Sequence, residues 1–118
     1  MPSLLIVDDE ADIRFLLRRM AEQAEWHVSG EAASGQEALD CYRQVKPDVV
    51  VLDFRMPGLS GLETAERILA EHPDQAIVFF TAFRDSALER AALALKIRAC
   101  LPKSELNRLL PVLRACLT

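Results

Sequence analysis

The sequence feature that most constrains the fold is an apolar run, Val49–Leu52, that leads directly into Asp53. A short β-branched run bounded by turn-forming residues indicates a strand that is buried on both faces. Met56-Pro57-Gly58 follows, and Ser60 then begins a helix. Asp53 is therefore predicted at the carboxyl end of a buried strand, which is where open α/β sheets place their ligand sites. A carboxylate at such a position costs free energy unless a cation or another partner compensates it.

The rest of the chain alternates between short apolar runs and segments with helical periodicity. We expect strands at Leu4–Val7, His27–Ala32, Asp48–Leu52, Ala76–Phe80 and Arg98–Leu101. A helix follows each strand. The first helix has an apolar face formed by Ile13, Leu16, Leu17, Met20 and Ala24. The next three run from Ser34 to about Val45, from Ser60 to before His72, and from about Asp85-Ser86. The last helix should become regular near Asn107 or Arg108, because Pro111 would break a helix that started at Ser104.

This alternation predicts an α/β fold with a parallel sheet and helices on both of its faces. The first, third and fourth strands are apolar throughout and belong in the centre, whereas the second and fifth are mixed and belong at the edges. With right-handed crossovers the simplest strand order is 2-1-3-4-5, a flavodoxin-like, doubly wound (βα)5 sheet. We expect residues 1–118 to form one such domain.

Composition excludes several classes of function. The net charge of −4 argues against direct nucleic-acid binding by this domain, and no segment is long and apolar enough to cross a membrane. The first residues lead straight into a strand, so no signal peptide is expected. The cysteines, Cys41, Cys100 and Cys116, are odd in number and far apart. Reduced thiols in a cytoplasmic protein are therefore expected, rather than a zinc site or disulfides.

Polar residues stand at the ends of four of the predicted strands: Asp8 and Asp9, Asp53, Thr81, and Lys103. Two carboxylates about 4 Å apart repel each other by about 4 kcal/mol at an effective dielectric constant of about 20. A cluster of three carboxylates must therefore bind a cation, take up protons or be neutralised by Lys103. A few hard oxygen ligands with positions left for water suit Mg²⁺ better than zinc. With the cation bound, Asp53 would be a nucleophile towards a phosphoryl group, which Thr81 and Lys103 would contact.

Each of these signals taken alone is more often structural. An Asp-Asp pair after a strand commonly caps a helix, a threonine at a strand end makes local hydrogen bonds, and a single lysine is a surface charge. Their joint position at one edge of the predicted sheet is what indicates a functional site.

The motifs Val7–Glu10 (V-D-D-E), Leu52–Gly61 (L-D-F-R-M-P-G-L-S-G), Thr81-Ala82 and Leu101–Ser104 (L-P-K-S), in this order and spacing, resemble the receiver domains of two-component response regulators. The resemblance covers essentially the whole chain. It implies that Asp53 accepts a phosphoryl group from a histidine of a sensor kinase. It also implies that Asp9 and Asp53 bind Mg²⁺ directly, Asp8 through water, and Arg55 through its backbone carbonyl group.

The resemblance further implies a switch. Thr81 and Lys103 would move on phosphorylation and remodel the face formed by the helix from about Ser86, the strand Arg98–Leu101 and the last helix, where we expect partner docking or a homodimer. Such a domain catalyses its own phosphoryl transfer and slow dephosphorylation and is not a turnover enzyme. We expect it to control an output, a transcription-regulating effector domain that is not in this chain. Arg55 and Phe83 are bulky residues at the positions that flank the hydrolytic water, which predicts slow dephosphorylation.

Two features depart from the family pattern. Cys100 stands where the family usually has Tyr or Phe, whose rotamer follows the switch threonine, and Lys96-Ile97 replaces the usual Gly-Ala before the fifth strand. A pseudo-receiver that signals without phosphate is therefore an alternative. Two others are weaker. A haloacid dehalogenase-type hydrolase needs an aspartate where Arg55 stands, and a flavodoxin-like electron carrier needs a phosphate loop that the sequence lacks.

Overall fold

The computed structural model of the protein describes residues 1–82 and 86–118. The strands in these ranges are β1 (Ser3–Val7), β2 (His27–Ala32), β3 (Val49–Leu52), β4 (Ala76–Thr81) and β5 (Ala99–Pro102). The helices are α1 (Ala11–Gln23), α2 (Gly35–Tyr42), α3 (Gly61–Glu71), α4 (Ser86–Ala94) and α5 (Leu106–Ala115), with a 3₁₀ turn, η1 (Lys103–Glu105), before α5.

The described strands form one five-stranded parallel sheet in the order β2-β1-β3-β4-β5. This confirms the predicted flavodoxin-like order, with β2 and β5 at the edges. The ladder between β1 and β2 shifts register between Leu4 and Leu5, where β2 accommodates an additional residue. The pairing then continues regularly up to Val7 and Ala32, so the bulge lies at the end of β1 remote from Asp8.

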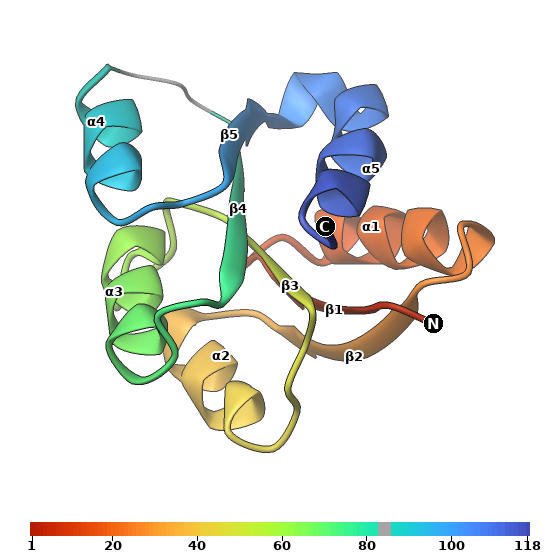
Figure 1. The fold of residues 1–118 in the computed structure, drawn as a ribbon, viewed down its shortest axis with the longest axis horizontal. Coiled ribbons are helices and arrows are strands. Elements are labelled where there is room, and N and C mark those ends of the chain that lie inside the picture. The colour runs from red at the N-terminus through yellow and green to blue at the C-terminus, as the bar shows by residue number, and fades with distance from the viewer. Residues whose placement is uncertain (83–85) are drawn as a thin grey trace.

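Alternation along the strands divides the core into two layers, one on each face of the sheet. Leu5, Val50 and Phe79 face the layer completed by α2, α3 and α4, whereas Leu4, Val51 and Phe80 face the layer completed by α1 and α5. Figure 1 shows the two groups of helices on opposite sides of the sheet. Because the central strands are buried on both faces, their backbone is a rigid support for the residues that follow them.

Capping residues define two of the helix starts as the sequence predicts. The Ser34 side chain accepts a hydrogen bond from the Glu37 amide at the start of α2. At the start of α3, Ser60 and Glu63 form a complete capping box, in which each side chain accepts from the other residue's backbone N–H. The α3 cap fixes the segment that follows Asp53.

Several element boundaries differ from the predicted ones. β1, β3 and β4 each differ by one residue at one end, and α2, β5 and α5 differ as follows. α2 ends at Tyr42 and not near Val45, because the Gln44 N–H donates to Cys41 O three residues back (3.0 Å), which closes the helix in a tight turn. β5 begins and ends one residue later than predicted and so includes Pro102. α5 begins at Leu106, directly after η1, with Pro111 inside it. The sequence predicts that the segment from Ser104 is not regular α-helix, because of Pro111. In the structure this segment is the 3₁₀ turn η1, which begins at Lys103.

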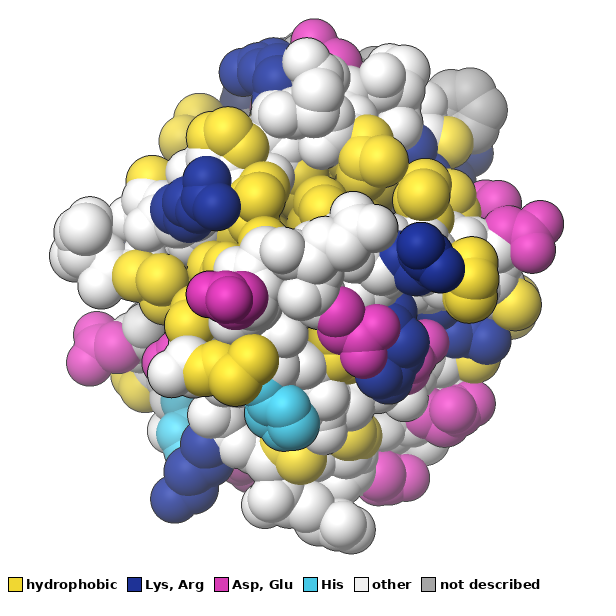
Figure 2. Space-filling model, turned by 90° about the vertical axis from the view of Figure 1, so that its right-hand side faces the viewer, with side chains coloured by type: hydrophobic (Ala, Val, Ile, Leu, Met, Phe, Trp, Pro, Cys, Tyr) yellow, Lys and Arg dark blue, Asp and Glu magenta, His cyan; other side chains and the backbone are white. Residues whose placement is uncertain are grey.

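The face that carries α1 and α5 is not purely polar. Figure 2 shows hydrophobic side chains interspersed with charged ones on this side of the molecule. Leu16 was predicted on the apolar face of the first helix, but its side chain is 44% exposed, and Phe15 beside it is 63% exposed. Among the described residues, no helix is both long and apolar enough to cross a membrane.

Candidate functional site

Two buried aspartates follow neighbouring central strands at the same edge of the sheet. Asp8 follows β1 and is 1% exposed, and Asp53 follows β3 and is 5% exposed. Their amides continue the sheet ladder, since Asp8 N–H donates to Ala32 O (3.0 Å) and Asp53 N–H donates to Val7 O (2.9 Å). The strands therefore fix the backbone of both aspartates and hold their carboxyl groups in a largely water-free setting.

Lys103 brings the acidic residues together. It is the first residue of η1, directly after edge strand β5. Its ammonium nitrogen lies 2.9 Å from Asp8 Oδ2, 3.2 Å from Asp53 Oδ2 and 3.3 Å from Glu10 Oε1. One cation thus faces three carboxylates, and the cluster carries a surplus of negative charge.

Burial governs the protonation of these groups. It raises the pKa of the Asp8 carboxyl group above its ordinary value, although the hydrogen bond from Lys103 opposes that shift. Burial also raises the pKa of Asp53, and the Asp8 carboxylate adds to the shift. For Lys103, burial favours the neutral amine, but the hydrogen bond to Asp8 and the charge of Asp53 outweigh it and raise its pKa. The carboxylates are therefore under-compensated, whereas the ammonium is held in its charged form.

The acidic residues fit a divalent cation. One carboxylate oxygen from each of Asp8, Asp9 and Glu10 lies within 4.8 Å of the others, and Asp53 is joined to Asp8 through Lys103. All are hard oxygen donors, which suit Mg²⁺, and the surplus charge at buried carboxylates is what a cation would relieve. Sequence reasoning missed Glu10. Its place as the N-cap residue of α1, where it makes no side-chain cap hydrogen bond, frees its carboxylate to turn towards Lys103.

The other predicted site residues lie around this cluster. Thr81 is buried at the end of β4 and pairs with Pro102, the residue before Lys103. Among the described residues, the three carboxylates and not Thr81 contact the Lys103 ammonium. Arg55 is exposed in the loop after β3. Phe83, which was predicted to flank the hydrolytic water, lies outside the described residues.

A glycine that sequence reasoning did not single out sets the loop after Asp53. Gly61 N–H donates to Phe54 O (2.7 Å), which draws the start of α3 against the end of β3. A Cβ atom at residue 61 would lie 2.7 Å from the Phe54 Cα atom and would overlap the Asp53 carbonyl oxygen. Only glycine allows this approach, so α3 fixes the Asp53 backbone from outside the sheet.

Gly61→Ala is expected to lower the free energy of unfolding by about 2 kcal/mol, because backbone atoms must move to admit the methyl group. It should also displace the Asp53 backbone, because the atoms that must move belong to that residue and to Phe54. The neighbouring variant Ser60→Ala loses only the cap, at about 1 kcal/mol, and should leave that backbone in place. Urea unfolding and the amide chemical shifts of Asp53 and Phe54 measure the two effects. Equal shift changes in both variants would contradict the role of Gly61.

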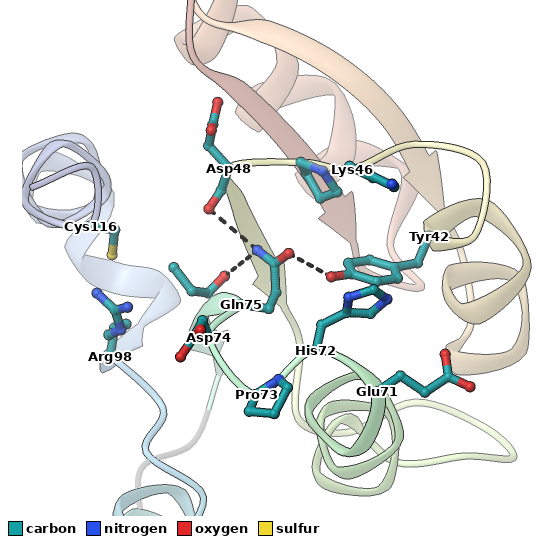
Figure 3. Close-up of a pocket in the computed structure, with 12 residues that line it drawn as sticks. Tyr42, Lys46, Asp48, Glu71, His72, Pro73, Asp74, Gln75, Arg98 and Cys116 are labelled. Carbon is teal, nitrogen blue, oxygen red and sulfur yellow. Dashed lines mark hydrogen bonds between the residues drawn. The ribbon is translucent and has the colours of Figure 1, made fainter.

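A cavity of about 450 Å³ lies at the opposite end of the sheet. Its lining includes residues that precede β3, β4 and β5, such as Asp48, Gln75 and Arg98, whereas Asp53 and Lys103 follow their strands. Figure 3 shows Gln75 between Tyr42 and Asp48. Gln75 accepts a hydrogen bond from the Tyr42 hydroxyl (2.6 Å) and donates to the Asp48 carbonyl oxygen (3.3 Å). This cavity is therefore separate from the acidic cluster.

Comparisons with known proteins agree on one family. A family model described as "Response regulator receiver domain" matches residues 4–114. Chemotaxis protein CheY of Thermotoga maritima is 35% identical over 85 residues, which cover 72% of this chain and 71% of CheY. The positive alginate biosynthesis regulatory protein of Pseudomonas aeruginosa is 42% identical over 89 residues, which cover 74% of this chain and 36% of that protein.

Solved structures show the same similarity. Response regulator protein TrrA from Thermotoga maritima, in complex with Mg²⁺-BeF, is 31% identical and superposes with a TM-score of 0.89, covering 98% of this chain and 99% of TrrA. Several curated relatives are much longer, and the chain spans between 22% and 38% of their length.

Proposed function

The chain belongs to the response regulator receiver domain family, and we propose that Asp53 is its phosphoryl acceptor and that a sensor histidine kinase is the donor. The observation that carries the proposal is the pair of buried carboxylates, Asp8 and Asp53, held by one ammonium group. Receiver domains bind Mg²⁺ at an acidic pocket, and the cluster of Asp8, Asp9 and Glu10 is compatible with that.

In the proposed reaction a carboxylate oxygen of Asp53 attacks the phosphorus atom of the donor. An O–P bond forms to Asp53 as the bond from phosphorus to the donor's imidazole nitrogen breaks, and the leaving imidazole takes up a proton. Lys103 contacts an oxygen of the phosphoryl group in place of one of its present carboxylates, and Thr81 donates a hydrogen bond to another. Positioning and charge compensation are the main demands of phosphoryl transfer, and a rigid strand end supplies the first.

Mg²⁺ would be held by Asp8, Asp9 and Asp53 and by the backbone carbonyl group of Arg55. When bound, it supplies Lewis-acid compensation for the charge that develops on the phosphoryl oxygens. The chain's own residues orient the acceptor carboxylate and keep water from it. Glu10 lies beside these ligands, and its carboxylate contacts the Lys103 ammonium group at 3.3 Å.

The output of the switch is proposed to be the face formed by α4, β5 and α5. Leu93 on α4 is 74% exposed, which supports a role for this face in docking a partner or in homodimerisation. Thr81 pairs with Pro102 of β5, and Lys103 directly follows Pro102 in the chain. A movement of Thr81 or Lys103 at the acidic cluster would therefore be transmitted to this face through β5. A transcription-regulating effector domain is the proposed recipient of the signal.

One observation favours a second candidate, a pseudo-receiver that acts as an interaction module without phosphate. Cys100 is half-buried on β5 and packs against the core layer that α4 covers. A small thiol there cannot report the state of Thr81 as an aromatic ring would. The intact acidic cluster and Lys103 argue for the phosphorylated switch.

Incubation with acetyl phosphate tests the two candidates, because this small donor replaces the unidentified kinase. Intact mass spectrometry is expected to find one phosphoryl adduct on the wild type that requires Mg²⁺. Asp53→Asn is expected to show none, because an amide is not a nucleophile towards phosphorus. Asp48→Asn, which changes an aspartate at the other end of β3, is the matched control and should be phosphorylated. A wild type that forms no adduct and binds no Mg²⁺ would favour the pseudo-receiver.

A further inference from the structure

Arg14 and Glu31 connect the acidic cluster to the edge strand β2. We propose that Arg14 is a positioning residue that fixes the Asp8–Asp9 turn for Mg²⁺, and that Glu31 fixes Arg14 in turn. The inference rests on the proposed function, because it concerns the metal affinity of that same site. It assigns a role in metal binding to two residues that lie outside the set of ligands.

The first contact is between Arg14 and the backbone of Asp8. Arg14 Nη1 donates a hydrogen bond to the Asp8 carbonyl oxygen at 2.6 Å. The Asp8 amide is held on its other side by Ala32 O of β2, at 3.0 Å. Asp8 is thus held at its amide by the sheet and at its carbonyl group by α1. The hydrogen bond from Arg14 is made to the peptide group that joins Asp8 to Asp9. It therefore fixes the orientation of that peptide group and, with it, the orientation of both side chains.

The second contact is between Arg14 and Glu31. Arg14 Nε lies 3.8 Å from Glu31 Oε1, and the side chains are only 21% and 27% exposed. Glu31 pairs with Ile6 in the ladder and directly precedes Ala32, the residue that accepts from the Asp8 amide. The other oxygen of Glu31 accepts from Arg18, which also lies 3.6 Å from Glu22. Glu31 therefore ties α1 to the strand that holds the Asp8 amide.

The contact of Arg14 with Asp8 is to the backbone and not to the carboxyl group. The Arg14 hydrogen bond goes to the Asp8 carbonyl oxygen, whereas Lys103 is the cation that contacts the Asp8 carboxylate, at 2.9 Å. The Asp8 side chain also takes its direction from the turn, since its Oδ1 accepts from the Glu10 amide at 2.9 Å. Residues that orient metal ligands from the outer shell govern metal affinity even though they do not touch the ion.

Mg²⁺ titration by calorimetry tests the inference on wild type, Arg14→Met, Arg14→Lys and Glu31→Gln. Arg14→Met is expected to weaken Mg²⁺ binding about tenfold. Arg14→Lys, which keeps one hydrogen-bond donor, and Glu31→Gln should each lose less Mg²⁺ affinity than Arg14→Met. In the double variant, adding Glu31→Gln to Arg14→Met should lower the affinity little further. At saturating Mg²⁺ all variants should reach nearly the wild-type phosphorylation rate, because Asp53 and Lys103 are unchanged. Without added Mg²⁺, Arg14→Met should speed amide hydrogen exchange at Asp8 and Glu10, whose N–H groups donate to Ala32 O and to Asp8 Oδ1.

Arg18→Met is the matched control, because Arg18 also pairs with Glu31 but does not contact the Asp8 peptide. It should bind Mg²⁺ like the wild type. The inference is overturned if Arg14→Met keeps wild-type affinity, or if Arg18→Met loses as much as Arg14→Met. Should Arg14→Met fail to fold, Arg14→Lys and Glu31→Gln decide by the same criterion. A wild type that binds no Mg²⁺ would overturn the proposed function together with this inference, whereas wild-type binding with unaffected Arg14 variants would overturn the inference alone.

Discussion

Replacing Lys103 with methionine is expected to lower the free energy of unfolding by about 3 kcal/mol at pH 7 and to slow phosphorylation of Asp53 about a hundredfold. Methionine keeps most of the side chain's length but leaves Asp8 and Asp53 buried without their cation. The same loss removes a positive group that would meet the phosphoryl oxygens. Urea unfolding without Mg²⁺ and initial rates with acetyl phosphate measure the two effects.

The stability loss in Lys103→Met should shrink as the pH falls. Burial raises the pKa of Asp8 and of Asp53, so the folded state binds more protons than the unfolded state above their ordinary pKa values. Stability therefore falls as the pH rises through that range, and more steeply once Lys103 is gone. In the wild type the pKa of Lys103 is itself raised, so its contribution is fully present at pH 7 and disappears only in strong alkali.

Lys46→Met is the matched control for this prediction. Lys46 is an exposed lysine in the segment between α2 and β3, at the end of the sheet opposite Asp53. Its replacement should change the free energy of unfolding by less than about 0.5 kcal/mol. If Lys103→Met matched this control in both stability and rate, the ammonium group would have no role in balancing the cluster.

Asp8→Asn is expected to abolish the response to Mg²⁺. At a Mg²⁺ concentration one hundred times its dissociation constant, the wild type should gain about 3 kcal/mol of unfolding free energy. The asparagine variant should gain nothing, because the central buried carboxylate of the metal cluster is missing, and its phosphorylation rate should fall with it. Without metal, the variant should remain within about 1 kcal/mol of the wild type, because Lys103 keeps Asp53 and Glu10 as partners.

Thermal unfolding with and without Mg²⁺ measures the difference between the two proteins. Asp12→Asn is the control, since Asp12 is an exposed acidic residue in the first turn of α1. That variant should respond to Mg²⁺ as the wild type does. Stabilisation of Asp8→Asn by Mg²⁺ to the wild-type extent would mean that the metal binds elsewhere.

The sequence was sufficient to predict the sheet order and the meeting of Asp8, Asp53 and Lys103. Apolar runs marked the central strands, and residues that follow neighbouring parallel strands must lie at one edge of the sheet. The predicted end of α2 was wrong by about three residues, because the end of a helix depends on where the chain must turn and not on the periodicity of its apolar residues. The same reason displaced β5 and the start of α5 by one or two residues.

The residues that surround the site were not predictable in the same way. From the sequence, Glu10 is predicted only to begin a helix. The position of Lys103 in the structure shows that the Glu10 carboxylate is part of the cluster. The contact of Arg14 with Asp8 depends on the angle between α1 and β1, and its contact with Glu31 on the register of an edge strand. Gly61 could be read as part of a turn, but its role follows from the approach of α3 to the backbone of Asp53.

We propose that residue 53 carries the phosphoryl group as a mixed anhydride. The most direct test is to phosphorylate the wild type with acetyl phosphate and Mg²⁺, reduce it with borohydride, and sequence the peptides by mass spectrometry. Borohydride reduces an aspartyl phosphate to homoserine and leaves free aspartate unchanged. We expect homoserine at residue 53, with aspartate retained at residues 8 and 9. Homoserine at another position, or aspartate at residue 53 in a protein that carries the adduct, would contradict the proposal.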